Sequence, residues 1–326
     1  MAEIYYSKAV HDALDEELAR DPKVILMGED IGVYGGAFGV TRGLFEKYGA
    51  KRLWETPISE NSFTGMAVGA AMLGLRPVVE IMFMDFIPLA LDQILNSATK
   101  LHYMYGEQVR VPLVIRTPGG AKGGYGPSHS QTLTGLLTSV PGLKVVAPST
   151  PAQAKGLLKS AIRDPNPVLV MENKRLYPRK GEVAEGEVLL PLDKAVVHRP
   201  GEALTLAAYS SMVPVCLAVA EAFQRDAGVS IEVLDLVSLN PIDQETLFAS
   251  VRKTGRLVIA EEACLTGGVG AEVSALVAEH CLESLEAPVL RVAARDLPIP
   301  SAINLEQIVL PSANDVVTAV QKALAY

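Results

Sequence analysis

Residues 55–75 read Glu55-Thr56-Pro57-Ile58-Ser59-Glu60-Asn61-Ser62-Phe63-Thr64-Gly65-Met66-Ala67-Val68-Gly69-Ala70-Ala71-Met72-Leu73-Gly74-Leu75, and this stretch organises the rest of the chain. It begins polar, breaks at Pro57, and then continues as an apolar segment with almost no bulky side chains. We expect a helix here, although each glycine inside a helix costs about 1 kcal/mol relative to alanine. Several glycines in one helix indicate that another group packs very close to its backbone.

Glu60 lies at or near the first turn of this expected helix, where a negative charge meets the positive end of the helix dipole. One interpretation is a surface acid that does no more than complete the helix end. The other is a carboxyl group held at the mouth of a slim helix and directed at a bound ligand. The residues around this stretch have to distinguish the two.

The composition excludes several classes of protein. The chain has 326 residues, of which 49% are hydrophobic, so we expect about two domains with substantial cores. The formal net charge of −8 disfavours nucleic acid or an anionic membrane as the main partner. No apolar run approaches the roughly 20 residues that span a bilayer.

The cysteines and the first residues point to a reducing compartment. Cys216, Cys264 and Cys281 have no metal-type spacing, and an odd number argues against a disulfide framework. The stretch from Met1 to Ser7 has no basic region followed by an apolar core, so we do not expect a secretion signal. We expect a cytoplasmic protein, or one of an organelle matrix or stroma if a transit peptide has been removed.

Short apolar runs alternate regularly with helical patterns in the first half of the chain. Strands are expected at 24–27, 53–54, 77–81, 111–116, 143–147 and 167–171, and helices at 7–20, 41–48, 60–74, 86–103 and 151–163. This alternation is typical of an α/β fold with an open, doubly wound, mostly parallel sheet. Ligands of such sheets bind beyond the carboxyl ends of the strands. Glu29, Glu60 and the loop that carries His129 all follow expected strands, so they can share one edge.

The alternation of strand and helix patterns stops at the end of the first half of the chain and resumes in the second half. Glycines and prolines punctuate a charged stretch, so we assign 1–180 to a first domain, 181–203 to a linker and 204–326 to a second doubly wound α/β domain. In the second domain, Gly267-Gly268-Val269-Gly270 opens a helix after a strand. It lacks the spacing of a dinucleotide-binding loop, and we expect it to serve tight helix packing.

At this point the sequence resembles a known family: the beta subunit of the thiamine-diphosphate-dependent decarboxylating component of 2-oxo acid dehydrogenase complexes. The resemblance runs essentially from end to end, and rests on the order and spacing of the motifs at 27–32, 56–60, 74–80, 129–131, 141–146, 161–164 and 233–236. It implies a transketolase-like pyrimidine-binding domain followed by a transketolase C-terminal-like domain. Relatives act on pyruvate, branched-chain 2-oxo acids or acetoin.

The resemblance also implies roles for individual residues. The glutamate that matches Glu60 hydrogen-bonds the aminopyrimidine ring of thiamine diphosphate, where a carboxyl group that shares a proton with the ring promotes the cofactor's own proton transfer. Phe86 and Ile58 match residues at the cofactor, with ordinary packing as the alternative. Glu29 matches a residue of an acidic passage between paired active sites. The alternative is that Glu29 only accepts hydrogen bonds from loop amides at the end of its strand. His129 matches a histidine at the substrate with proton or acyl-transfer duties; the alternative is an anchor for its glycine-rich loop.

Two metal ions belong to the same resemblance. Main-chain oxygens bind a structural potassium ion in some relatives, and the matching residues here are Leu113, Ala161, Ile162, Asp164 and Asn166. An ordinary turn between helix and strand is the alternative. Thiamine-diphosphate enzymes hold the diphosphate through Mg²⁺ with a Gly-Asp-Gly motif, and this sequence has none. The resemblance implies that an alpha subunit supplies that half of the site, and its Mg²⁺, in an α2β2 heterotetramer.

We therefore expect an enzyme subunit that is active only with its alpha partner. It would catalyse oxidative decarboxylation of a 2-oxo acid and pass the acyl group to lipoyl groups of a dihydrolipoyl acyltransferase core, which the second domain would bind. The segments 61–65 and 265–268 resemble those of the pyruvate and acetoin members of the family, so we favour these substrates. The alternatives are an acetoin or branched-chain 2-oxo acid dehydrogenase beta subunit, or a non-catalytic assembly subunit. The missing diphosphate motif and the length argue against a self-sufficient enzyme of the transketolase kind.

Overall fold

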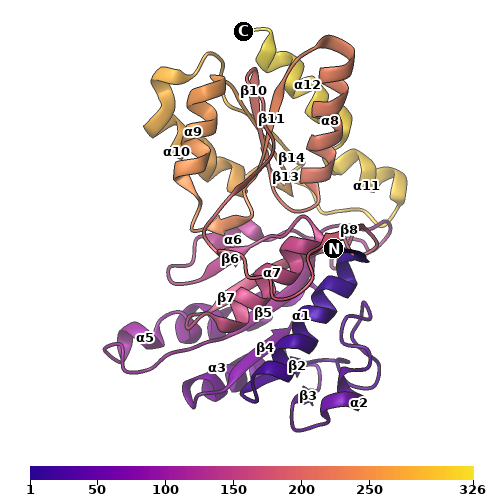
Figure 1. Cartoon of the computed structure of the whole chain (residues 1–326), viewed down its shortest axis with the longest axis vertical. Helices are drawn as coiled ribbons and strands as arrows, with labels where there is room; N and C mark the ends of the chain where they lie inside the picture. Colours follow the sequence, from indigo (N-terminus) through magenta and orange to yellow (C-terminus); the bar gives the residue numbers. More distant parts are fainter. The chain divides into compact units, whose positions relative to one another are not determined.

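The computed structural model describes residues 1–326, which form two compact units (Figure 1). The first unit comprises residues 1–119 and 137–192, and the second comprises residues 120–136 and 193–326. No helix is both long enough and apolar enough to cross a membrane.

The first unit is built on parallel strands in the order β6-β7-β5-β4-β2-β3. These strands are β2 (Val24–Gly28), β3 (Leu53–Glu55), β4 (Arg76–Glu80), β5 (Val114–Gly119), β6 (Lys144–Val146) and β7 (Val168–Asn173). Its helices are α1 (Tyr6–Arg20), α2 (Leu44–Tyr48), α3 (Glu60–Met72), η1 (Met84–Phe86), α4 (Ile87–Asp92), η2 (Gln93–Ala98), α5 (Leu101–Met104) and α7 (Pro151–Arg163). Helix α1 packs on α7, while α3 packs on α4 and η2. Residues of β2 and β7 are buried throughout, as expected for parallel strands covered on both faces.

The second unit repeats this architecture with a sheet in the order β14-β13-β10-β11-β9. Its strands are β9 (Val196–Arg199), β10 (Leu204–Ala208), β11 (Ile231–Asp235), β12 (Ser238–Asn240), β13 (Leu257–Cys264) and β14 (Leu290–Ala294). Its helices are α8 (Met212–Ala227), α9 (Gln244–Thr254), α10 (Val269–Cys281), η3 (Leu282–Ser284), α11 (Ile303–Val309) and α12 (Ala313–Leu324), and α6 (Thr134–Thr138) spans the limit between the units. Figure 1 shows α9 and α10 on one side of the sheet and α8 and α12 on the other. The predicted α/β class is confirmed.

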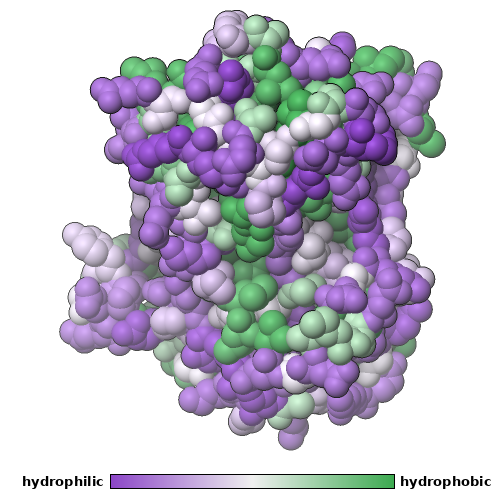
Figure 2. All heavy atoms as spheres, turned by 45° about the horizontal axis from the view of Figure 1, so that its top comes forward, coloured by the Kyte–Doolittle hydropathy of each residue, from purple (hydrophilic) through white to green (hydrophobic).

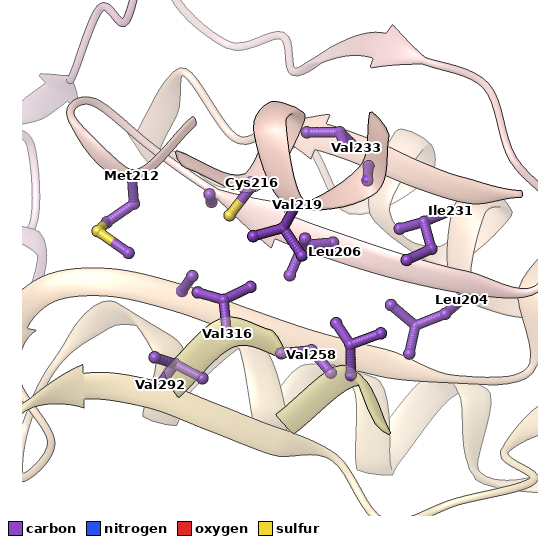
Figure 3. Close-up of a cluster of buried hydrophobic side chains, with 14 of the residues drawn as sticks. Leu204, Leu206, Met212, Cys216, Val219, Ile231, Val233, Val258, Val292 and Val316 are labelled. Atoms are coloured by element: carbon purple, nitrogen blue, oxygen red, sulfur yellow. The ribbon is translucent and has the colours of Figure 1, made fainter. Parts of the chain in front are cut away.

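The core of the second unit lies between the sheet and the helices α8 and α12. Buried aliphatic side chains from β10, β11 and β13 meet those of both helices, as the close-up in Figure 3 shows. Val219 and Val316, from the two helices, point toward the same strands. Close packing of this kind is what lets a short sheet hold its loops in fixed positions.

Two expected helices differ from what the chain adopts. The expected helix at 86–103 is broken into η1, α4, η2 and α5. In η2 the N–H of Thr99 reaches back five residues to the carbonyl of Ile94 at 3.2 Å, so the turn is wider than an α-helix. The expected helix at 41–48 begins only at Leu44, because Gly43 has a left-handed φ of 83°. The hydrophobic period of a sequence does not reveal either effect.

The expected linker at 181–203 contains strand residues. Residues 180–183 form β8, which pairs antiparallel with β1 (Ala2–Tyr5), and 196–199 form β9, which pairs antiparallel with β11. Both are edge strands with exposed side chains, so their sequences lack the apolar alternation that marks a strand. The glycine-rich segment 120–136, expected within the first domain, belongs to the second unit.

Candidate functional site

Two carboxyl groups meet where β2 ends and α3 begins. Glu29 follows β2 directly, and Glu60 is the first residue of α3. The backbone N–H of Ser59, the residue before that helix, donates a hydrogen bond to the Glu29 carboxylate. Glu29 and Glu60 are each only 5% exposed. The parallel sheet thus brings together two acids that are about thirty residues apart in the sequence, as the expected strand-end arrangement requires.

The surroundings of Glu29 favour a carboxyl group that is protonated up to near neutral pH. Burial, and next the negative charge of Glu60, raise the pKa of Glu29 to about 7. Glu29 Oε1 is buried and has no hydrogen-bond partner in the chain. A buried oxygen without a partner is costly, so the site is suited to a ligand that brings a donor. A carboxyl group that holds its proton up to about neutral pH, close to a second buried carboxyl group, is suited to acid–base chemistry.

The glycines of α3 have two different surroundings. A Cβ on Gly65 would lie 3.1 Å from the side-chain oxygen of Gln93 in η2, so this glycine permits close packing within the chain. A Cβ on Gly69 would meet nothing within 4 Å. Beside it, Met66 is 55% exposed and Leu73 is 89% exposed. The close neighbour that the sequence predicts is therefore present for Gly65, and the Gly69 face of the helix is open in the chain by itself.

The other two residues expected at the cofactor differ in exposure. Ile58 lies just before α3 and is 82% exposed. Phe86 ends η1 and is half-buried, with its ring in an edge-to-face contact 5.8 Å from the ring of Phe83. Exposed apolar side chains occur elsewhere too, among the polar surface residues in Figure 2. Such side chains close to two buried carboxyl groups can contact either a ligand or a partner chain.

His129 lies in the second unit, on a segment held by two carboxylates that the sequence did not single out. Glu262 accepts a hydrogen bond from the Ala121 N–H at 2.8 Å, and Glu306 accepts bonds from two successive glycine N–H groups at 3.0 Å. Nδ1 of His129 and the Ser128 hydroxyl are hydrogen-bonded at 2.9 Å. Only the tertiary structure could reveal these anchors, since about 140 to 180 residues separate the partners.

A pocket of about 640 Å³ opens beside this histidine segment. Its lining includes residues from both sides of His129, residues at the end of β13 and residues that follow β14, among them Pro127, Gln131, Glu262, Asp296 and Ile299. The walls are largely apolar, with carboxylates at a few points. A pocket with these walls in the second unit is a place where a small organic molecule or a partner's side chain can bind.

The expected potassium ligands lie close to fixed cationic groups. The guanidinium of Arg76 donates to the carbonyl oxygens of Ile162 at 2.8 Å and Asp164 at 3.2 Å. The carbonyl of Leu113 accepts the Val168 N–H at 2.9 Å. Each of these carbonyl oxygens already accepts one hydrogen bond, so only its second lone pair remains for a potassium ion. The ion would also lie near the positive charge of Arg76. No cluster of His, Cys, Asp or Glu side chains could hold a metal ion instead.

The glycine-rich start of α10 is filled by the chain itself. Glu261 accepts a hydrogen bond from the Gly270 N–H at 2.9 Å, and a Cβ on Gly268 would lie 2.5 Å from the Glu261 carboxylate. Free N–H groups at a helix start bind phosphate in dinucleotide sites. Here a carboxylate takes that place, so these glycines serve packing.

Comparison with known proteins gives consistent results for both halves of the chain. Residues 2–180 match the family described as "Transketolase, pyrimidine binding domain", and residues 193–316 match "Transketolase, C-terminal domain". The chain is 47% identical to "Pyruvate dehydrogenase E1 component subunit beta-2, mitochondrial" of Oryza sativa subsp. japonica, covering 98% of this chain and 86% of that protein. It is 45% identical to "Pyruvate dehydrogenase E1 component subunit beta" of Rickettsia bellii, covering 98% of both.

A solved structure is similar over the same length. The protein described as "Split gene transketolase, inactive beta4 tetramer" matches with a TM-score of 0.81 and 27% identity, covering 99% of this chain and 98% of that one.

Proposed function

Because this chain belongs to the family of beta subunits of the E1 component of 2-oxo acid dehydrogenases, we propose specific roles for the residues that its structure brings together. The chain is the beta subunit of a thiamine-diphosphate-dependent oxidoreductase component. We propose pyruvate as its substrate, as in the names of the relatives, and lipoyl groups of an acyltransferase core as the acyl acceptor. The observation that carries the proposal is the Glu29–Glu60 pair.

Glu60 is the residue that holds and moves a proton at the aminopyrimidine ring. Thiamine diphosphate, when bound, supplies the reactive carbon that attacks the 2-oxo group and stores the electrons released with carbon dioxide. With the cofactor bound, Glu60 would face the aminopyrimidine ring from the start of α3, where the helix dipole would stabilise a negative charge. Glu29 supplies the neighbouring proton, which its pKa of about 7 makes available near neutral pH. Phe86 and Ile58 would contact the ring.

His129 acts on the substrate side. Its segment is held by Glu262 and Glu306, and a fixed backbone keeps the imidazole at a constant position for proton or acyl transfer. Since the sequence has no Gly-Asp-Gly motif, the diphosphate and its Mg²⁺ belong to the alpha subunit. We keep the potassium site at Leu113, Ala161, Ile162, Asp164 and Asn166 as a proposal as well.

Partnership with an alpha subunit follows from the family, and the structure offers a face for it. The exposed stripe of α3 (Met66, Gly69 and Leu73) carries apolar groups around an open glycine, which suits close packing of another helix. We propose that the alpha subunit docks here in an α2β2 assembly, and that the second domain holds the acyltransferase core. Residues 1–180 then form the pyrimidine-binding domain and 204–326 the C-terminal domain.

The compartment and the exact substrate remain part of the proposal. The rice relative is named as mitochondrial and another relative is from Rickettsia, so either the bacterial cytoplasm or an organelle matrix suits this chain. Acetoin and branched-chain 2-oxo acids are the alternative substrates, to be compared with pyruvate in the same dye-reduction assay.

The test is Glu60→Gln in the enzyme assembled with its alpha subunit. General acid–base groups contribute roughly 10²- to 10⁴-fold, so the rate of pyruvate-dependent dye reduction should fall at least a hundredfold while the assembly stays intact. The matched control is Glu46→Gln, which alters an exposed acid on α2. If Glu60→Gln keeps its activity, the subunit has a scaffold role and the catalytic assignment is wrong.

A further inference from the structure

A buried ion-pair network joins three neighbouring strands in the first unit. Arg116 on β5 is 1% exposed and lies between β4 and β7 in the sheet (Figure 1). Its Nε and Nη2 each donate to a different oxygen of Glu172 at 2.8 Å, and its Nη1 donates to Glu80. A buried charge is tolerated only when its partners are in place, so this network holds its members in a fixed geometry.

A row of aromatic rings leads away from that network. The hydroxyl of Tyr177 donates to Glu172 at 2.7 Å, and its ring lies 5.3 Å from Phe38. Phe38 contacts Phe83 edge-to-face at 5.4 Å, and Phe83 contacts Phe86 edge-to-face at 5.8 Å. These distances are those of favourable aromatic pairs. A continuous chain of contacts therefore runs from a buried carboxylate to Phe86.

Phe83 is the residue where these contacts converge. Besides the rings of Phe38 and Phe86, it has the ammonium group of Lys174 over its face, 5.0 Å from the ring centroid. Lys174 is fully buried, so its cation–π contact is stronger than one at the surface. Two of the three ring–ring contacts in the row are edge-to-face and both involve Phe83; together with the Lys174 contact they leave its ring little freedom to turn.

The glycine-rich loop that carries Phe38 passes close to the same network. Gly36 has a left-handed φ of 82°, and a Cβ there would lie 3.3 Å from a carboxylate oxygen of Glu80. The loop can approach the ion pair this closely only because the residue is glycine. Phe38 therefore presents its ring to Phe83 from a loop that passes close to the ion pair.

We propose that Phe83 is a positioning residue that fixes the ring of Phe86, so that the buried network of Arg116 sets the geometry of the aminopyrimidine contact. This inference rests on the proposed function, because Phe86 is the residue expected at the cofactor. Phe83 itself need not touch the cofactor. It acts through Phe86.

The test measures the binding of thiamine diphosphate to the assembled α and β subunits by calorimetry, for Phe83→Leu and for Phe38→Leu. Loss of these ring contacts should raise the Kd for thiamine diphosphate about three- to tenfold. The KM for thiamine diphosphate should rise in parallel while the KM for pyruvate stays unchanged. The matched control, Phe223→Leu, removes a half-buried ring from the core of the second unit. It should lower the melting temperature and leave the Kd unaltered.

The outcomes separate this inference from the proposal beneath it. If Glu60→Gln abolishes turnover while Phe83→Leu and Phe38→Leu both bind thiamine diphosphate with the wild-type Kd, the positioning role is refuted and the proposed function stands. If Phe223→Leu weakens binding as much as the other two, the effect is general destabilisation and the inference is again overturned. Should Phe83→Leu fail to fold, Phe38→Leu decides alone.

Discussion

Gly69 offers the sharpest test of how α3 is used, because the same position matters differently in the isolated chain and in the assembly. It lies within α3, and a Cβ there would meet nothing within 4 Å. The isolated chain therefore has room for a larger residue. In the assembly, by contrast, the proposed alpha subunit packs on this face. We compare Gly69→Ala with Gly69→Leu.

The expected magnitudes follow from helix propensity and from packing. Glycine costs about 1 kcal/mol relative to alanine inside a helix, and leucine is nearly as favourable as alanine. Both variants should thus stabilise the isolated chain by up to about 1 kcal/mol, which is roughly 2–4 °C in melting temperature for a unit of this size. Extra bulk in a well-packed contact typically costs about 1–3 kcal/mol. Gly69→Leu should therefore weaken assembly about 5- to 150-fold.

The measurements are differential scanning calorimetry of the isolated chain and analytical ultracentrifugation with the alpha subunit. The control is Ala278→Leu, which adds bulk to an exposed position of α10 in the second unit. The docking argument would be refuted by a Gly69→Leu chain that is as stable as expected and still joins the alpha subunit with the wild-type affinity. The open glycine would then need another explanation.

Two further predictions concern ionisation and potassium. The pKa of Glu29 is raised from 4.5 to about 7, so between these two values the native state holds more protons than the unfolded state and stability falls as pH rises. Glu29→Gln should remove this dependence of stability on pH. After allowance for solvent screening, it should stabilise the isolated chain by roughly 1–2 kcal/mol at pH 8 and change its stability little at pH 4, which urea unfolding at both pH values would measure. A variant that is destabilised at pH 8 would contradict the assignment. If the oxygens of Leu113, Ile162 and Asp164 bind potassium, the melting temperature should be higher in KCl than in choline chloride of equal ionic strength, because an ion that binds only the native state stabilises it. Identical melting curves would show that the Arg76 hydrogen bonds hold this turn without an ion.

Local sequence patterns predicted the elements whose signal is local. The apolar runs at 24–27 and 167–171 are the buried strands β2 and β7, and the helix expected at 151–163 is α7 with those limits. Glu60 was expected in the first turn of its helix and is the first residue of α3. In each case a run of neighbouring residues carries the information, since hydrophobic period and helix-start residues act over a few positions.

Patterns of this kind could not predict features that depend on distant partners. The strands β1 and β8 pair across nearly the whole first unit, and neither has an apolar face of its own. The π-helical turn at η2 interrupts a stretch whose apolar period alone predicts one long helix. The histidine segment is held by Glu262 and Glu306, which lie far along the chain.

The sequence by itself determined which chemical groups are available: a carboxyl group at the head of a slim helix, another after a buried strand, and the motifs of the family. The tertiary structure alone decided how those groups behave. Parallel pairing of β2 with β3 and β4 places the loops after these strands at one edge and brings Glu29 beside Glu60. The pKa of Glu29 is raised by burial and by that neighbouring charge, and neither exists until the chain has folded.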